Sequence, residues 1–261
     1  MSRRQFSTLP ASLVVALALA ACGSSSSTTS TSPASSGPTG SITVLAAASL
    51  TKAFDLIDAN FEKAHPGTTI TVSYGASSAL ATQITQGAPA DVFASASQKT
   101  MESVVSAGKA SASTPFAKNV MEVVVPADNP AQISALADLA KPGVKVALCQ
   151  QEVPCGATAA KVFANAQLTV KPVTEEADVK ATLAKVTLGE VDAAVVYVTD
   201  ALAAGDKVKA IEIPAEINAS TAYPIATVTG TANQGLAEAF VAYVLSAEGQ
   251  KVLADAGFVQ P

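Results

Sequence analysis

The stretch Ile42-Thr43-Val44-Leu45-Ala46-Ala47-Ala48-Ser49-Leu50 decides the fold of this chain. It begins with apolar and β-branched residues that are typical of a strand, and it then runs into three alanines, where the backbone becomes accessible. From residue 50 to residue 61, apolar residues recur at helical spacing. The stretch therefore predicts a strand that leads through Ser49 into an amphipathic helix.

A helix start of this kind can bind an anion. Its first N–H groups have no partner within the helix, and the helix dipole adds partial positive charge there. The alternative is that Ser49 only caps the helix. The pattern recurs once, because the alternating strand Ile70–Tyr74 leads through Gly75 and Ala76 to Ser77 and a second helix. Anion binding and capping both remain open at this point.

Strand and helix patterns alternate along the rest of the chain. They include a helix at 176–186, a fully apolar strand at Ala193–Tyr197, and closing helices at 233–245 and 247–256. This alternation predicts an α/β fold with mostly parallel sheet, in which ligands bind where strand ends meet helix N-termini. The sequence contains neither a dinucleotide-binding fingerprint nor a P-loop.

The N-terminal segment predicts export. Residues 1–21 form a signal peptide, with Arg3 and Arg4 before an apolar run that is too short to span a membrane permanently. Leu19-Ala20-Ala21-Cys22 resembles a bacterial lipobox, in which Cys22 is lipidated, although an ordinary cleaved signal is the alternative. Residues 2–6 also resemble a twin-arginine signal. The rest of segment 22–40 is rich in Ser, Thr, Pro and Gly, and it predicts a flexible tether.

Charge and cysteine content narrow the function further. The chain has 16 basic and 21 acidic side chains, and both arginines lie in the signal, so the mature charge is −7. Such a chain is a poor nucleic-acid binder. Cys149 and Cys155 are close together in an exported chain, which predicts a disulfide. The alternative, a metal site, lacks further Cys or His ligands nearby.

Several strand ends present groups that a tetrahedral oxyanion would bind. Ser49, Ser77 and Tyr197 offer hydroxyl groups, and the helices that open at Cys155 and near Val179 offer backbone N–H groups. No Lys or Arg lies at these positions, so a dianion would be held by neutral dipoles. Such a site favours a fully deprotonated anion, because a protonated one also needs an acceptor.

Enzyme activity is not expected. The only His, His65, lies in a helix-ending His65-Pro66-Gly67 turn, and residues 75–79 do not form a nucleophile elbow. A serine hydrolase would have to combine Ser77 with His65, which is kept only as an alternative. No metal or organic cofactor is predicted.

Six segments, which occur in the same order along the chain, closely resemble one known family. They are Ala46–Leu50, Gly75–Ser78, Gly87–Phe93, Val153–Gly156, Val195–Tyr197 with Asp200-Ala201, and Gly257-Phe258. Together they resemble the molybdate-binding proteins of bacterial ABC importers, the ModA family, over residues 41–261. The resemblance implies a class II periplasmic-binding-protein fold, with two crossing hinge strands near 119–125 and 223–228. It implies one lobe of residues 41–120 plus 225–261 and a second lobe of residues 121–224.

The resemblance also implies a site and a function. Hydroxyl groups of Ser49, Ser77 and Tyr197 and backbone N–H groups of Cys155 and Val179 would bind the anion, although Cys155 stands where the family often has Ala. The implied protein is a monomeric lipoprotein on the outer face of the cell membrane that delivers molybdate or tungstate to an ABC permease. A receptor for sulfate or another small oxyanion, and a structural lipoprotein without a ligand, are the remaining alternatives.

Overall fold

The computed structural model describes residues 37–261, which form one compact unit. The predicted signal peptide, the predicted lipidation site Cys22 and most of the predicted tether lie outside the described residues. Within residues 37–261, no helix is long and apolar enough to cross a membrane.

One half of the unit is built on a parallel sheet with β1 at its centre. Strand β1 (Gly40–Ala47) pairs with β2 (Thr68–Gly75) and with β3 (Val92–Ala94), and the small residues at the end of β1 lie level with Tyr74 and Gly75. Successive side chains of β1 point to opposite faces, so Val44 enters one hydrophobic cluster and Leu45 another.

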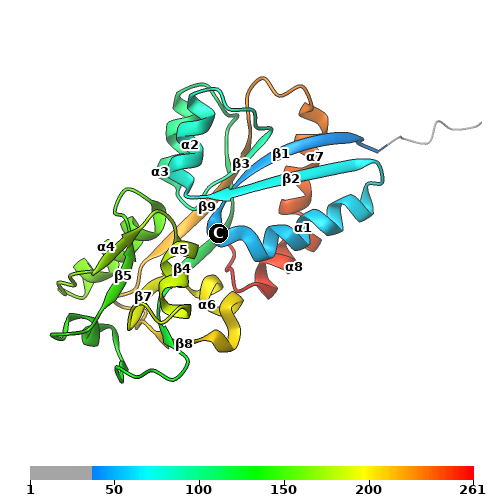
Figure 1. Cartoon of the computed structure of the whole chain (residues 1–261). Helices are drawn as coiled ribbons and strands as arrows, with labels where there is room; N and C mark the ends of the chain where they lie inside the picture. The colour runs from blue at the N-terminus through cyan, green and yellow to red at the C-terminus, as the bar shows by residue number, and fades with distance from the viewer. Residues whose placement is uncertain (1–36) are drawn as a thin grey trace, which may run out of the picture. The chain divides into compact units, whose positions relative to one another are not determined.

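Helices cover both faces of this sheet (Figure 1). Helices α1 (Thr51–Ala64), α7 (Gln234–Leu245) and α8 (Ala247–Asp255) contribute to the cluster that contains Val44. Helices α2 (Ser77–Thr85) and α3 (Gln98–Ser106) contribute to the cluster that contains Leu45. At the carboxyl end of β1, the short 3-10 helix η1 (Ala48–Leu50) leads into α1.

The other half has its own hydrophobic cluster around the parallel strands β6, β5 and β7. These strands are Thr174–Glu176, Val146–Cys149 and Ala193–Tyr197, and every residue of β7 is buried. Three helices pack around them: α4 (Pro154–Asn165), α5 (Val179–Thr187) and α6 (Val198–Ala204). Strand β8 (Val208–Glu212) and two 3-10 helices, η2 (Leu136–Ala140) and η3 (Gly205–Lys207), complete this half.

The long strand β4 (Thr114–Pro126) connects the two halves. Its first part pairs with β9 (Ser220–Thr227) as far as Val120, and from Met121 onward it pairs with β7 and β8 (Figure 1). Strand β9 in turn pairs with β3. The fold is therefore the predicted two-lobed class II architecture, with β4 and β9 as the crossing strands.

The expected parallel pairing holds for the central strands of each half but not for the pairs that β4 and β9 make. Strands β2, β1 and β3 are parallel, and so are β6, β5 and β7. Among residues 37–261, all four antiparallel pairs involve β4 or β9. The sheet is mixed because these two strands leave one half and enter the other in opposite directions.

One expected helix begins later in the structure than the sequence suggests. Residues 174–176 form the short strand β6, so the predicted start of a helix at Glu176 is wrong. Helix α5 begins at Val179, because the Asp178 carboxylate accepts hydrogen bonds from the N–H groups of Lys180 and Ala181 and so fixes the N-terminus there.

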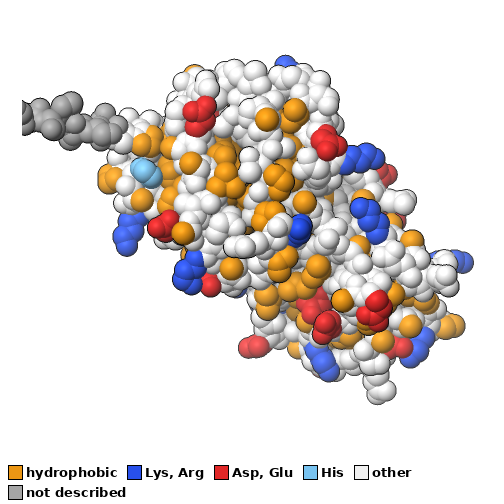
Figure 2. Space-filling model, turned by 180° about the vertical axis from the view of Figure 1, so that it is seen from behind, with side chains coloured by type: hydrophobic (Ala, Val, Ile, Leu, Met, Phe, Trp, Pro, Cys, Tyr) orange, Lys and Arg blue, Asp and Glu red, His pale blue; other side chains and the backbone are white. Residues whose placement is uncertain are grey.

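Charged side chains are mixed on the face that Figure 2 shows. Basic and acidic groups alternate over this face and do not gather into a single patch.

Candidate anion-binding site

Strand ends and helix starts from both halves enclose one small cavity. It is lined by Ala47, Ala48, Ser49, Gly75, Ala76, Ser77, Ala96, Val153, Pro154, Cys155, Asp178, Val179 and Tyr197. This set contains all five residues that the sequence analysis selected for anion binding. Each of the five is at most 7% exposed, so little of their surface reaches bulk water.

The size and lining of the cavity restrict what can enter it. The space that the centre of a water molecule can reach inside it is about 20 Å³. Organic ligands of drug size need pockets of roughly 300–1,000 Å³. No Lys, Arg or His belongs to the lining residues, and Asp178 is their only acidic member. The cavity therefore suits a small ion and offers it hydrogen bonds in place of a cationic side chain.

Ser49 does not cap a helix. It lies inside η1, and neither η1 nor α1 has a side-chain cap at its N-terminus. Instead, its hydroxyl lies 2.8 Å from the hydroxyl of Tyr223 on β9, a buried contact between residues far apart in sequence. The capping alternative is therefore wrong for this side chain.

Ser77 does not cap a helix either. It is the first residue of α2, whose N-cap is Ala76 and has no side-chain hydrogen bond. The Ser77 hydroxyl oxygen accepts a hydrogen bond of 2.9 Å from the backbone N–H of Ala96, just after β3. Its own proton remains available, because a hydroxyl can donate once and accept twice.

Tyr197 ends the buried strand β7 with its hydroxyl unsatisfied. It is 1% exposed, and its Oη atom has no hydrogen-bond partner among the described residues. Burial raises the pKa of this phenol above its ordinary value, so the group is a neutral donor. An unsatisfied buried hydroxyl costs about 1–3 kcal/mol, which a ligand that accepts its proton would recover.

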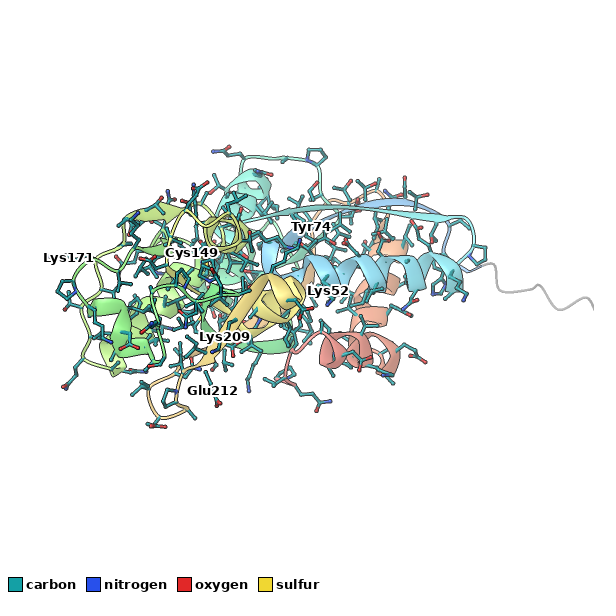
Figure 3. The ribbon with its side chains drawn as sticks, turned by 60° about the horizontal axis from the view of Figure 1, so that its bottom comes forward. Lys52, Tyr74, Cys149, Lys171, Lys209 and Glu212 are labelled. Atoms are coloured by element: carbon teal, nitrogen blue, oxygen red, sulfur yellow. A yellow bond between two sulfur atoms is a disulfide. The ribbon has the colours of Figure 1, made fainter. Side chains whose placement is uncertain are left out.

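Helix α4 presents backbone donors through Cys155. The first hydrogen bond within this helix runs from Ala157 N–H to the carbonyl of Val153, so the N–H of Cys155 precedes it. A disulfide joins Cys155 to Cys149 at the end of β5, with 5.8 Å between their Cα atoms. Figure 3 shows Cys149 within this half.

The neighbouring Gly156 makes this turn possible. A Cβ atom at Gly156 would overlap the carbonyl group of Gln150, and no larger residue fits without movement of the backbone. The disulfide and the close approach of these two segments together hold the Cys155 N–H at the cavity.

Helix α5 presents the backbone N–H of Val179. Asp178 serves the next two N–H groups, those of Lys180 and Ala181, and leaves the N–H of Val179 without a partner from this cap. The Asp178 carboxylate thus binds N–H groups of the helix, and the N–H of Val179 remains available to a ligand in the cavity.

The site as a whole is rich in donors. It combines the three hydroxyl groups with the N-termini of α2, α4 and α5, which carry partial positive charge. Such preorganised dipoles stabilise a buried anion without a mobile cation. Among residues 37–261, no group of three or more His, Cys, Asp or Glu side chains could hold a metal ion.

Sequence reasoning missed two residues behind the lining, Tyr223 and Asn119. Both are buried, and the side-chain amide of Asn119 lies 3.5 Å from the hydroxyl of Tyr223. The sequence placed both only in long apolar runs, because neither has a local signal of a polar role. Their partners, Ser49 and Thr199, are distant in sequence, so only the fold brings this group together.

A buried carboxyl group lies close to the same tyrosines. Asp200 is 3% exposed, and its Oδ2 atom has no hydrogen-bond partner among the described residues. Burial raises the pKa of Asp200 to about 7, although the charge of Lys180 opposes the increase. The group therefore carries a proton for part of the neutral pH range.

The serine hydrolase alternative lacks a histidine at the site. His65 ends helix α1, where its ring packs against Phe61 with 4.4 Å between ring centroids. It is not among the residues that line the cavity with Ser77.

Comparison with known proteins identifies the family. Residues 42–259 match the family described as bacterial extracellular solute-binding protein. The chain belongs to this family. This solute-binding protein is 42% identical, over 98% of both chains, to the molybdate-binding protein ModA of Mycobacterium tuberculosis. It is 34% identical, again over 98% of both chains, to the putative ABC transporter substrate-binding lipoprotein YvgL of Bacillus subtilis.

These relatives confirm the resemblance found in the sequence. Solute-binding proteins are components of transport systems and are not enzymes, which agrees with the expected absence of catalysis. They act outside the cytoplasm, so the extracytoplasmic location is also supported.

Solved structures support the fold of this solute-binding protein. The periplasmic molybdate-binding protein of Azotobacter vinelandii superposes with a TM-score of 0.73 at 21% identity, over 84% of this chain and 99% of that chain. The sulfate-binding protein SubI of Mycobacterium tuberculosis gives the same TM-score of 0.73 at 23% identity, over 84% of this chain and 86% of that chain. The architecture is therefore shared by proteins named for different anions, and the fold alone does not select between them.

Proposed function

We propose that this solute-binding protein captures molybdate in the cavity between its halves. Ser49, Ser77 and Tyr197 donate hydrogen bonds from their side chains, and Cys155 and Val179 donate from their backbone. The proposal is supported by the location of all five residues at one cavity and by the 42% identity to a protein named molybdate-binding.

The observation that carries the proposal is the unsatisfied hydroxyl of Tyr197. A buried phenol without a partner is costly, and it lines a cavity whose other polar groups are mainly donors. A small anion with oxygen atoms on all sides would satisfy these donors together.

The donor-rich lining favours a fully deprotonated tetrahedral anion. Phosphate near neutral pH carries a proton that needs an acceptor, and the one lining carboxylate, Asp178, already accepts from two N–H groups. Sulfate and molybdate differ mainly in size, because metal–oxygen bonds in molybdate and tungstate are longer than the bonds in sulfate. Selection by size would admit tungstate together with molybdate and would disfavour sulfate.

Closure of two lobes accounts for how the anion is held. The proposed lobes are residues 41–120 plus 225–261 and residues 121–224. The division of most buried residues into clusters supports them, with Ala48 and Tyr223 each in the cluster of the other lobe. Ser49 and Ser77 come from the first lobe, and Cys155, Val179 and Tyr197 come from the second. A bound anion would stabilise the closed form, because only that form completes the set of donors.

The cellular setting follows from the N-terminal segment and the relatives. Lipidation at Cys22 would anchor a monomer to the outer face of the cell membrane, and the tether would let it reach an ABC permease that accepts the anion. The similarity to a protein named as a lipoprotein supports this anchoring.

Competition between anions tests the proposal. The protein is saturated with molybdate, and tungstate, sulfate or phosphate is then added while bound molybdate is measured by equilibrium dialysis. We expect tungstate to displace molybdate at similar concentrations and sulfate and phosphate to fail at large excess. Equal displacement by sulfate would make the protein a receptor for small oxyanions in general.

A further inference from the structure

A chain of buried polar side chains extends from the cavity to the crossing strands. The hydroxyl of Ser49 contacts the hydroxyl of Tyr223 at 2.8 Å, and either atom could donate in this pair. The amide nitrogen Nδ2 of Asn119 lies 3.5 Å from the hydroxyl of Tyr223 and 2.8 Å from the hydroxyl of Thr199. All four residues are buried, so water does not replace these partners.

The orientation of the Asn119 amide sets the direction of this chain. Its oxygen Oδ1 accepts a hydrogen bond of 3.0 Å from the backbone N–H of Val120. The amide nitrogen, which can only donate, therefore faces Tyr223 and Thr199. The Tyr223 oxygen is placed to accept from Asn119, and its single proton is then available to Ser49 at 2.8 Å, a pair in which either hydroxyl could donate.

The direction matters at Ser49. When its oxygen accepts from Tyr223, its own proton is free for the cavity. Ser77 is arranged in the same way, because its oxygen accepts from the Ala96 N–H and its proton remains free. With Tyr223 as the donor, two serines in different elements each accept one hydrogen bond from the protein and keep their own proton to donate.

We propose that Asn119 and Tyr223 are positioning residues that hold Ser49 as a hydrogen-bond donor to the bound anion. This inference rests on the proposed function, because it assigns the second set of residues behind the same site. Neither residue lines the cavity, so the proposed effect of each on the ligand is indirect and passes through Ser49.

These hydrogen-bonded side chains lie on the strands that connect the two halves. Asn119 lies on β4 and Tyr223 on β9, which are the two crossing strands. Thr199, the other partner of Asn119, lies two residues after Tyr197 at the start of α6. One amide on the crossing strand β4 therefore contacts two hydroxyl groups, that of Tyr223 on the other crossing strand and that of Thr199 in the second half.

The protonation state of Tyr223 suits this role. Burial raises the pKa of this phenol well above its ordinary value, and the nearby Tyr197 and Asp200 raise it further. The group remains a protonated donor over the whole physiological range.

A double-mutant cycle tests the inference. Affinity for molybdate is measured for the wild type, Tyr223→Phe, Ser49→Ala and the combined variant. We expect Tyr223→Phe to weaken binding about tenfold in the wild-type background and less than about twofold once Ser49 is Ala, because its effect passes through that hydroxyl. Tyr74→Phe is the matched control, because Tyr74 (Figure 3) does not line the cavity. Its hydroxyl donates to Asp55 on α1, so its loss should leave the affinity unchanged.

The outcomes separate the inference from the proposed function. If the folded wild type does not bind molybdate, the proposed function fails. If the wild type binds and Tyr223→Phe binds equally well, or if the two substitutions weaken binding additively, the positioning role is refuted. If Tyr223→Phe does not fold, the same cycle with Asn119→Ala tests the positioning role. Without the Asn119 amide, nothing orients the Tyr223 hydroxyl as a donor to Ser49. Thermal unfolding of every variant without ligand accompanies the cycle.

Discussion

The backbone N–H of Ala96 donates a hydrogen bond of 2.9 Å to the hydroxyl oxygen of Ser77. The two residues lie at the end of one strand and the start of one helix, 19 positions apart in the sequence. This bond fixes the serine rotamer and consumes one of its acceptor positions. The Ser77 proton is thereby left to a ligand in the cavity.

Substitution of Ser77 by Ala should weaken molybdate binding. The variant loses one hydrogen bond to a charged ligand and leaves the Ala96 N–H without its partner, which together cost about 1–3 kcal/mol. Calorimetric titration should show Kd raised by roughly tenfold to a hundredfold. Ser78→Ala, one residue further along α2 and outside the cavity lining, should bind like the wild type. Equal affinities for Ser77→Ala and the wild type would remove Ser77 from the site.

Substitution of Tyr197 by Phe should change stability and affinity in opposite directions. The variant removes an unsatisfied buried hydroxyl, so the protein without ligand should be as stable as the wild type or more stable. Molybdate binding should weaken by about 1–3 kcal/mol, because the anion loses a donor. Thermal unfolding without ligand and calorimetry with ligand measure the two effects.

A matched control for this variant is available on helix α7. Tyr243→Phe also removes a phenolic hydroxyl, but at a position far along the chain from any lining residue, and it should leave Kd unchanged. If Tyr197→Phe instead destabilises the ligand-free protein and binds molybdate normally, the hydroxyl has a structural role and no role in binding.

The disulfide should contribute to stability more than to binding. The two cysteines are six positions apart, and the chain-entropy model gives about 2 kcal/mol for so short a loop. Cys149→Ala combined with Cys155→Ala should lower the free energy of unfolding by about this amount in urea titrations. The backbone N–H of residue 155 survives the change, so Kd should rise only through a looser turn. A large loss of affinity without loss of stability would contradict this account.

Asp200 should make stability fall as the pH rises toward neutrality. Its pKa is about 7 in the folded protein and near 3.8 in the unfolded chain, so the folded state keeps a proton that the unfolded state has released. The contribution of Asp200 to the free energy of unfolding is therefore greatest below about pH 4 and is lost as the pH rises to about 7. A pKa difference of this size corresponds to at most about 4 kcal/mol.

The comparison with Asp200→Asn isolates this carboxyl group. The variant has no proton to lose, so the difference in unfolding free energy between variant and wild type should grow from pH 4 to pH 7. Burial also raises the pKa of Asp58 to about 6, but that group is common to both proteins and cancels in the difference. A constant difference across this range would show that Asp200 does not titrate there.

Much of the site could be predicted from sequence because its residues carry local signals. Ser49 and Ser77 each follow a strand with small residues, and Tyr197 ends an apolar strand. The position of each element was therefore visible in the pattern. The role of the two serines was less clear, because a serine before a helix usually caps it, and only the bonds to Tyr223 and Ala96 exclude capping here.

The residues behind the site could not be found in the same way. Asn119 and Tyr223 meet through the pairing of β4 with β9, which joins positions more than 100 residues apart. The late start of α5 is a similar case, since strand β6 forms only by pairing with β5. Tertiary pairing decided these features, and local propensity carries no information about it.

The central claim is that the cavity binds a deprotonated tetrahedral anion of the size of molybdate. Calorimetric titration of the protein with molybdate, then sulfate, then phosphate tests it most directly. The account predicts tight binding of one molybdate per chain and no heat from sulfate or phosphate. Absence of binding heat with all three anions would contradict it, and the donors of the cavity would then have only a structural role.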